Sequence, residues 1–328
     1  MKALVTGSAG HLGEAMVSTL QDQGIETVGL DLKESPFTSI IGSIVNRRSV
    51  EASMKGVQVV YHTATLHKPH VATHNKQDFI DANITGTLNL LEAALAVDVK
   101  AFVFTSTTSV FGDALRPPPD QPAAWITEDV TPIPKNIYGV SKSAAEDLCH
   151  LFYRSSGLNC IVLRTSRFFP EEDDDRLKRQ NYDSDNLKVN EFLFRRVEIE
   201  DVVTAHLAAS ENAQRIGFGR YIISATTPFS RDDLAALRTN APGVVESRLP
   251  GYRKIYSRLG WKMFAEIDRV YDNSAARADL GWEPKYDFAY VIGCLDRGED
   301  FRSPLARAVG AKGYHDQRFN NGPYPVIR

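Results

Sequence analysis

Apolar and polar positions follow two rhythms along the first half of the chain. Short, nearly continuous apolar runs are typical of strands buried in a parallel sheet. Between them, apolar residues recur at helical spacing, as Ile80, Ile84, Leu88, Leu91 and Leu95 do. The expected strands are 3–5, 25–30, 57–61, 101–105 and 159–163, and the expected helices are 11–23, 78–97 and 137–155. This alternation predicts an α/β fold of Rossmann type, a doubly wound parallel sheet with right-handed crossovers.

The regular alternation is lost in the second half. A proline-rich stretch, 116–134, interrupts it first, and 171–188 is so polar that we expect a loop there. A helix at 199–211 and a strand at 221–224 would return the chain to the sheet. We therefore predict a nucleotide-binding domain from 1–165 with 199–225 added, and a smaller C-terminal substrate-binding cap from 166–198 and 226–328.

Three glycines follow the first expected strand and lead into the first expected helix. Gly7, Gly10 and Gly13 have the spacing of a turn that admits a diphosphate at a helix N-terminus. Asp31 ends the second strand, where a carboxylate would accept the hydroxyls of an adenosine ribose. A carboxylate repels a 2′-phosphate, so we expect NAD rather than NADP, although the neighbouring Lys33 weakens this preference.

Composition excludes several classes of partner. The chain has 328 residues, a net charge of −3 and 43% hydrophobic residues, which gives no electrostatic reason to expect nucleic acid or a membrane surface. Strand-like sequence begins at Lys2, which leaves no room for a signal peptide. Three scattered cysteines are typical of reduced, buried thiols. We expect a cytoplasmic protein.

A second group of residues suggests a reaction. Tyr138 and Lys142 are four apart, so on a helix they share one face. A nearby Lys⁺ and a positive nicotinamide ring favour the phenolate, and bringing its pKa from 10 to 7 takes about 4 kcal/mol. Thr107 lies in a hydroxyl-rich run at the end of the fourth strand, where it would hold a substrate oxygen, although such hydroxyls often bond only to their own backbone.

These motifs together resemble one known family. The chain is similar to the extended short-chain dehydrogenases/reductases, of the NAD-dependent epimerase/dehydratase family. The resemblance rests on the following motifs, which occur in the family's order: Thr6–Gly13, Asp31, Asn83–Thr87, Ser106–Thr107, Val110–Gly112, Tyr138-x-x-x-Lys142, Val197–Val203 and Asp272–Pro284.

The resemblance implies a role for each matching residue. Tyr138 would be the catalytic base or acid, Lys142 would bind the nicotinamide ribose and lower the pKa of Tyr138, and Thr107 would be the catalytic hydroxyl. The expected cofactor-binding residues are Gly7, Gly10, His11, Leu12, Gly13, Asp31, Ser43, Ile44, His62, Ala64, Asn83 and Lys142. The resemblance also implies a homodimer through the helices at 78–97 and 137–155, although a helix buried within one subunit would look the same.

Three departures from the family pattern narrow the function. Thr107 is followed by Thr108 and Ser109 instead of the Asp-Glu pair of dehydratases, so we expect no dehydration. The segment 164–201 is short for a nucleotide-sugar enzyme, which favours a compact substrate. Ser43 replaces the usual adenine-binding acid and would bind more weakly. The expected substrate residues are His67, Thr108, Arg167, Phe168 and Arg196.

Three closely spaced histidines raise the question of a metal site. No acid or cysteine accompanies His67, His70 and His74 at ligand spacing, so we expect no metal.

The expected activity is NAD-dependent dehydrogenation or epimerisation at a carbinol of a sugar, sugar acid or small polyol. The alternatives are a UDP-sugar 4-epimerase and a non-catalytic protein that senses NAD.

Overall fold

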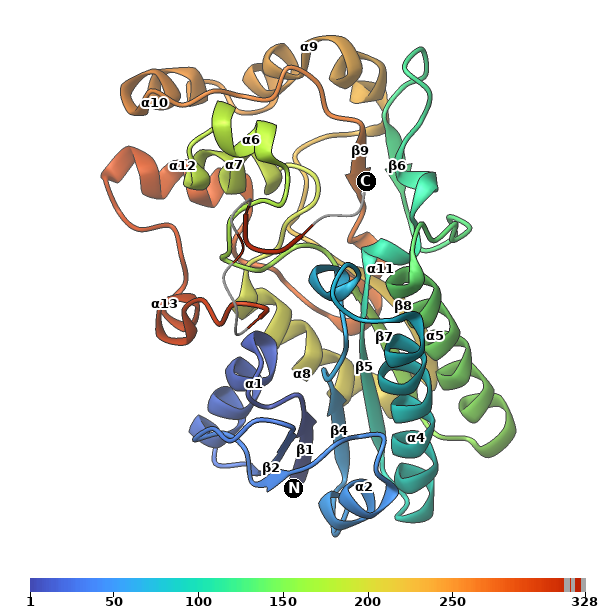
Figure 1. The fold of residues 1–328 in the computed structure, drawn as a ribbon. Helices are drawn as coiled ribbons and strands as arrows, with labels where there is room; N and C mark the ends of the chain where they lie inside the picture. The colour runs from blue at the N-terminus through green and yellow to red at the C-terminus, as the bar shows by residue number, and fades with distance from the viewer. Residues whose placement is uncertain (316–318, 320–321, 326–328) are drawn as a thin grey trace.

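A seven-stranded parallel sheet forms the base of the molecule in the computed structural model, which describes residues 1–315, 319 and 322–325 (Figure 1). The strand order is β3-β2-β1-β4-β5-β7-β8, so the direction of winding reverses between β1 and β4. The strands are β1 Lys2–Thr6, β2 Glu26–Asp31, β3 Ile40–Ile41, β4 Val59–His62, β5 Ala101–Thr107, β7 Cys160–Thr165 and β8 Phe218–Ile223. The predicted Rossmann-type fold is confirmed, and such a reversal is where open α/β sheets bind their ligands.

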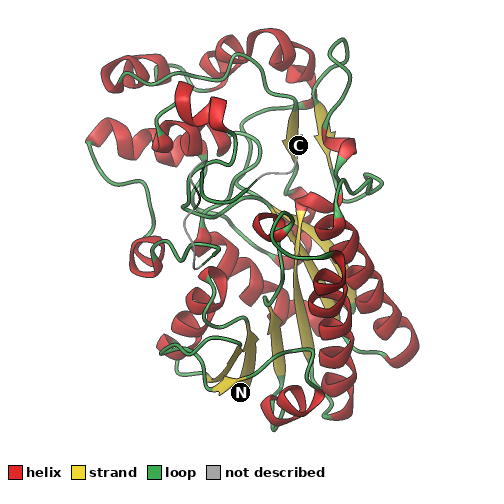
Figure 2. Ribbon diagram, viewed as in Figure 1, coloured by secondary structure: helices red, strands yellow, loops and turns green. Residues whose placement is uncertain are grey.

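Helices cover both faces of this sheet (Figure 2). One face packs against α1 His11–Asp22 and α8 Ile199–Ile216, with α11 Ser274–Leu280 and α13 Pro304–Val309 beside them. The other face packs against α2 Arg47–Ser53, α4 Gly86–Ala96 and α5 Ile137–Ser156. Successive strand residues therefore serve opposite cores, as Val103 and Phe104 do on β5.

The long helix predicted at 78–97 is not a uniform α-helix. It starts as α3 Lys76–Phe79, widens into a π-helix at Ile80–Thr85 and continues as α4. The π segment presents Asn83 inward, toward the loop after β4. Such segments occur often at functional sites, and the apolar spacing alone does not reveal the change of pitch.

The cap packs around its own aromatic core above the carboxyl edge of the sheet (Figure 1). It contains α6 Arg176–Asn181, α7 Ser184–Glu191, α9 Leu234–Arg248, α10 Tyr252–Leu259, α12 Phe288–Arg297 and a parallel strand pair, β6 Ala124–Ile126 with β9 Arg269–Tyr271. Short 3₁₀ turns occupy Lys68–His70, Thr108–Val110, Asp113–Leu115 and Arg231–Asp233. The division into domains at the boundaries given above stays a prediction.

The expectation of a loop at 171–188 is wrong. α6 and the start of α7 lie there, and each begins at an aspartate, Asp175 or Asp183, whose carboxylate accepts backbone N–H groups. α6 buries none of its residues, so it has no apolar face from which a helix could be predicted. Within the described residues, no helix is long and apolar enough to span a bilayer.

Candidate active site

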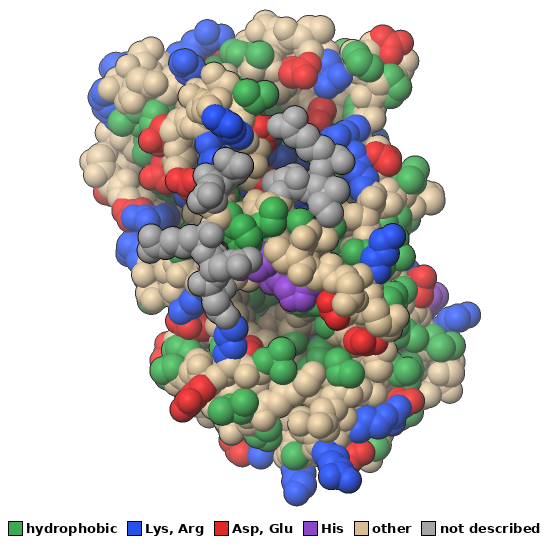
Figure 3. Space-filling model, in the orientation of Figure 1, with side chains coloured by type: hydrophobic (Ala, Val, Ile, Leu, Met, Phe, Trp, Pro, Cys, Tyr) green, Lys and Arg blue, Asp and Glu red, His purple; other side chains and the backbone are tan. Residues whose placement is uncertain are grey.

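A cavity of about 800 Å³ lies where the carboxyl ends of β1, β4 and β5 face the cap. This volume is within the usual range for a cofactor or small-molecule pocket. Histidine side chains are visible in the hollow between the two halves of the molecule (Figure 3). The predicted site residues that line the cavity are Gly7, Gly10, His11, Leu12, Gly13, Asp31, Ser43, Ile44, Ala64, His67, Thr107, Thr108, Tyr138, Arg167 and Phe168.

The glycine turn leaves room for a ligand backbone. Gly7 has a φ of +72°, and a Cβ there would lie 2.9 Å from the backbone of Ala64. A Cβ on Gly13 would lie 1.9 Å from the carbonyl oxygen of Gly7, so the third glycine permits close packing of α1. The first backbone bond within α1 runs from Glu14 N to Gly10 O, so the N–H groups of the first turn, at 11–13, remain available to an anion.

The carboxylate of Asp31 is fixed beside this turn. Its Oδ2 accepts the N–H of Ala9 at 3.0 Å and its Oδ1 accepts the N–H of Lys33 at 2.9 Å. Two backbone bonds orient both oxygens within the cavity, where they retain lone pairs for the hydroxyls of a ribose. The structure therefore supports the expected position of Asp31.

Asp31→Ala is expected to weaken NAD⁺ binding by about tenfold to a hundredfold, because hydrogen bonds to a charged acceptor contribute about 1.5–3 kcal/mol. Isothermal titration with NAD⁺ and NADP⁺ measures the change. Asp22→Ala, at the exposed end of α1, is the matched control. Equal NAD⁺ affinity in all three proteins would remove Asp31 from the cofactor site.

The residues expected to transfer the proton lie together at the end of β5. Asn136 caps α5 by accepting the N–H of Gly139 at 3.1 Å, which places Tyr138 in the first turn. The phenol of Tyr138 is hydrogen-bonded to the side chain of Thr107. Lys142 lies one turn later, 2% exposed, and donates from Nζ to the carbonyl oxygen of Thr105 at 2.7 Å.

Burial dominates the titration of both groups. It raises the pKa of Tyr138 to about 12, and only the bond from Thr107 opposes this. It lowers the pKa of Lys142 to about 7, against the attraction of Glu146. The ammonium of Lys142 is directed to the carbonyl oxygen of Thr105, and its expected effect on the pKa of Tyr138 stays a prediction. An added positive charge beside Tyr138 is needed to make the phenolate accessible.

The buried lysine also gives stability a measurable pH dependence. Between about pH 7 and the ordinary pKa of 10.5, the native protein binds fewer protons at Lys142 than the unfolded chain does. The free energy of unfolding therefore rises with pH in that window, by up to about 1.4 kcal/mol per pH unit. We expect Lys142→Met to remove this rise in urea titrations, and the exposed Lys100→Met to retain it. Parallel pH profiles for all three proteins would contradict the low pKa of Lys142.

Two residues expected to contact the cofactor, His62 and Asn83, bond to elements that lie behind the cavity lining. His62 is buried with its Nδ1 bonded to Thr6 at 2.8 Å and its Nε2 bonded to Thr87 at 2.9 Å. The amide of Asn83 bonds both the N–H and the carbonyl of Leu66, at 2.9 and 2.8 Å. Neither side chain is part of the cavity lining. Through these bonds the two residues fix the end of β4 and the loop that follows it, and this loop lines the cavity.

The arginines of the cap are largely neutralised. Arg167 lines the cavity but pairs with Asp173 and with Glu191, the latter at 3.2 Å. Arg196 pairs with Glu191 at 2.9 Å and lines a smaller pocket instead of the main cavity, and its role in substrate binding stays a prediction. Burial would raise the pKa of Glu191, but the three arginines Arg195, Arg167 and Arg196 outweigh it and hold that pKa well below its usual range.

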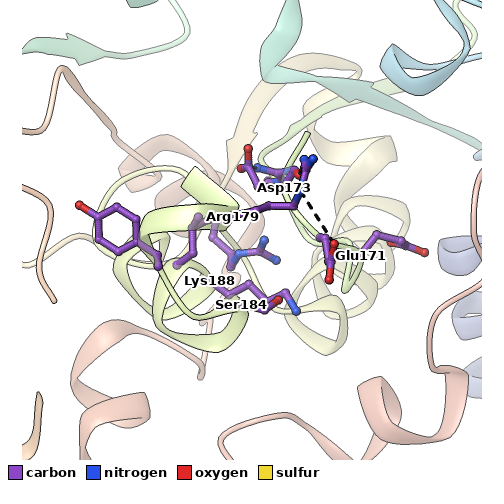
Figure 4. Close-up of a pocket in the computed structure, with 10 residues that line it drawn as sticks. Glu171, Asp173, Arg179, Ser184 and Lys188 are labelled. Atoms are coloured by element: carbon purple, nitrogen blue, oxygen red, sulfur yellow. Dashed lines mark hydrogen bonds and ion pairs between the residues drawn. The ribbon is translucent and has the colours of Figure 1, made fainter. Parts of the chain in front are cut away.

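A smaller pocket of about 80 Å³ lies beyond this cluster, within the cap. Arg179, Lys188 and Ser184 converge on it with Glu171 and Asp173, as Figure 4 shows. Asp173 is only 7% exposed, so the acidic run that we expected as a solvated loop is partly buried.

Four residues that line the cavity each have a buried polar atom with no hydrogen-bond partner among the described residues. These atoms are Nδ1 of His11, in the glycine turn, Oγ of Ser166, just after β7, and Nε of Arg195 and Arg269. Buried polar groups usually have partners, so atoms like these indicate a bound ligand. Together with the glycine turn and Asp31, they fit a dinucleotide.

The histidines of the motif 67–74 lie at the mouth of the cavity. The ring of His67 is 6.5 Å from that of Tyr138 and 4.7 Å from that of His70. Burial lowers the pKa of His70 to about 4. No group of three potential ligand side chains in the part of the chain that the structure describes could hold a metal ion. That the protein needs no metal stays a prediction.

Comparison with known proteins agrees with this geometry. The sequence model of the NAD dependent epimerase/dehydratase family matches residues 3–223. The chain belongs to this family. NAD is thus its cofactor, as predicted, and the resemblance to the NAD-dependent epimerase/dehydratase family is confirmed.

Relatives within the family have diverse activities. The chain is 30% identical over 173 residues to a UDP-glucose 4-epimerase of Halalkalibacterium halodurans, covering 50% of each. It is 31% identical over 168 residues to an L-arabinose 1-dehydrogenase (NAD(P)(+)) of Haloferax volcanii, covering 49% of this chain and 64% of the relative. The chain spans about half the length of the first curated relatives it matches.

A solved structure shares the fold over nearly the whole chain. A short-chain dehydrogenase/reductase superfamily protein from Agrobacterium tumefaciens, with bound NAD, aligns with a TM-score of 0.63 and 24% identity. The alignment covers 94% of this chain and 99% of that one. The likeness extends through the cap, beyond the residues of the family match.

Proposed function

We propose that the protein is an NAD-dependent dehydrogenase or epimerase that acts on a carbinol of a sugar, sugar acid or related small polyol. One observation carries the proposal. Tyr138, hydrogen-bonded to Thr107, lines the same cavity as the glycine turn and Asp31. A proton acceptor and a dinucleotide site in one cavity suit the oxidation of a hydroxyl group.

When bound, NAD⁺ supplies the hydride acceptor and a positively charged ring. Thr107 Oγ1 would hold the substrate hydroxyl in line with the phenol, and Tyr138 Oη would take its proton as the hydride leaves the same carbon. Lys142, now anchored to Thr105, would hold the cofactor ribose and add positive charge beneath the phenol. The reverse transfers would return the proton and hydride to the carbonyl.

Dehydrogenation and epimerisation would use the same residues, so the products of turnover must distinguish the two reactions. A dehydrogenase releases its ketone and accumulates NADH, whereas an epimerase returns the hydride to the other face and shows no net NADH. NADH absorbance and product chromatography over a panel of free sugars, sugar acids and UDP-sugars test the proposal. Absence of any NADH or epimer from the panel would contradict it.

UDP-sugar epimerisation is the second candidate. It is supported by the sequence likeness to UDP-glucose 4-epimerases and by Arg167, Arg195 and Arg269 in the cavity lining. Arginines bind diphosphates well, but Arg167 and Arg195 already share Glu191. Titration with UDP-glucose separates the candidates, because micromolar affinity would favour the UDP-sugar enzyme.

We also propose a cytoplasmic homodimer. Val140 and Leu151 on α5 are 47% and 45% exposed, and Leu95 at the end of α4 is 41% exposed. The two helices lie side by side (Figure 1), so these side chains would form one apolar face for a second copy. Light scattering of the wild type and of Val140→Glu tests the assembly, which the charge is expected to break.

A further inference from the structure

The C-terminal segment folds back into the active-site cavity. Lys312, Tyr314, His315 and Tyr324 line the same cavity as Tyr138, although they lie more than 170 residues away in the sequence. Sequence patterning gave no role to this segment beyond membership of the cap. Its described residues supply a wall that neither the sheet nor the rest of the cap provides.

Contacts from three separate elements hold this segment in place. Glu171, after β7, accepts the N–H of Gly313 and the phenol of Tyr314, each at 3.1 Å. His70, after β4, bonds the carbonyl of Tyr314 at 3.2 Å. Lys312 pairs with Glu14 of α1 at 2.5 Å. The backbone and the phenol are both fixed, so the orientation of the Tyr314 ring is determined.

The ring of Tyr314 forms part of an aromatic wall near the catalytic phenol. Its centroid is 5.2 Å from that of His67 and 5.8 Å from that of Phe169. His67 in turn contacts the ring of Tyr138, at 6.5 Å. Aromatic faces carry partial negative charge and attract the slightly positive C–H groups of an adjacent molecule, such as those on one face of a sugar ring.

Described residues of the same segment also contact the cap beside its small pocket. Gly322 lies so close to the guanidinium of Arg179, which lines that pocket, that a Cβ would be 2.9 Å from it. The ring of Tyr324 lies 5.4 Å from that of Tyr314, and its phenol is hydrogen-bonded to Asp174. Tyr314 and Tyr324 are therefore neighbouring parts of the cavity wall on the side of the cap.

We propose that Tyr314 is a specificity-determining residue, which packs against the C–H face of a free sugar or sugar acid and excludes its nucleotide-linked forms. This inference rests on the proposed function, since it places the reacting carbinol at Tyr138. It names the class of substrate, a single ring-sized polyol without a nucleotide. Glu171 acts as the positioning residue for Tyr314 through the two bonds described above.

Kinetics of Tyr314→Ala on paired substrates test the inference. The probes are D-glucose, D-galactose and D-glucuronate, each with its UDP-linked form, and the matched control is Tyr290→Ala, on α12 outside the cavity. We expect Tyr314→Ala to raise KM for the best free sugar by about tenfold or more, with kcat within about threefold, and to admit the UDP-linked form. Tyr314→Phe keeps the ring and is expected to retain most of the wild-type specificity.

The outcomes separate this inference from the proposed function. An unchanged KM in Tyr314→Ala, or a wild type that prefers the UDP-linked form, overturns the role of Tyr314 and leaves the redox function standing. Failure of the wild type to act on any compound of the panel overturns both. NADH binding followed by fluorescence, expected to be equal in all variants, shows that each protein is folded.

Discussion

Tyr138→Phe is expected to lower kcat by about a hundredfold to ten-thousandfold and to leave NAD⁺ affinity unchanged. The substitution removes one oxygen atom, the one that would exchange a proton with the substrate, and keeps the ring that fills the first turn of α5. The surrounding hydroxyl of Thr107 remains to hold the substrate but cannot replace the phenol as a base, since its own pKa is far higher. Steady-state kinetics with the substrate found above measure the loss.

The control for this variant is Tyr153→Phe, which changes a half-buried tyrosine on the same helix away from the cavity. It is expected to behave like the wild type. A Tyr138→Phe protein with undiminished turnover would exclude proton transfer by this residue. Full NAD⁺ binding with no activity in any protein, the wild type included, would instead favour the NAD-sensing alternative.

Arg164→Leu is expected to lower the free energy of unfolding by about 3–5 kcal/mol. Arg164 and Glu146 are 4% and 2% exposed, and they are joined by an N–H to carboxylate contact of 2.8 Å beneath the catalytic residues. Removing the guanidinium leaves the carboxylate in a buried site with its remaining contacts to Arg220, at 3.2 Å, and to the hydroxyl of Ser106. Urea unfolding at neutral pH measures the loss.

The double variant Glu146→Leu/Arg164→Leu provides the decisive comparison. Replacing both members of a buried pair with apolar groups costs less than removing one, because no charge is left without its partner. We therefore expect the double variant to be more stable than Arg164→Leu alone. A double variant that loses the sum of the two single effects would show that the pair is not coupled.

The sheet and the cofactor end of the site could be predicted from the sequence because their signals are local. Apolar runs mark the strands, and Gly7 and Asp31 each lie at the end of a strand, so sheet topology alone brings them together. The placement of Tyr138 and Lys142 on one helical face was also predictable from their spacing, and their catalytic roles stay a proposal. Lys142 nevertheless bonds to Thr105, a contact that no local pattern encodes.

Part of the substrate end could not be predicted because its contacts join distant segments. Glu191 forms ion pairs with three arginines, and one of them, Arg196, lies outside the main cavity. Tyr314 is held at the site by bonds to Glu171 and His70. α6 has no apolar face to indicate a helix at all. Each of these features depends on tertiary partners that a single sequence does not reveal.

The pairing of β6 with β9 has a mechanical consequence for catalysis. β6 and β9 both lie in the cap, and the chain runs from β6 to the start of α5, so the helix that carries Tyr138 is joined to the cap through this pair. Asp272 adds to the connection by accepting a hydrogen bond from the indole of Trp125 at 2.9 Å. We expect a displacement of the cap to be transmitted along this segment toward Tyr138. Grafting a relative's cap onto this base would therefore require transplanting 123–126 as well, or the tyrosine would lose its alignment.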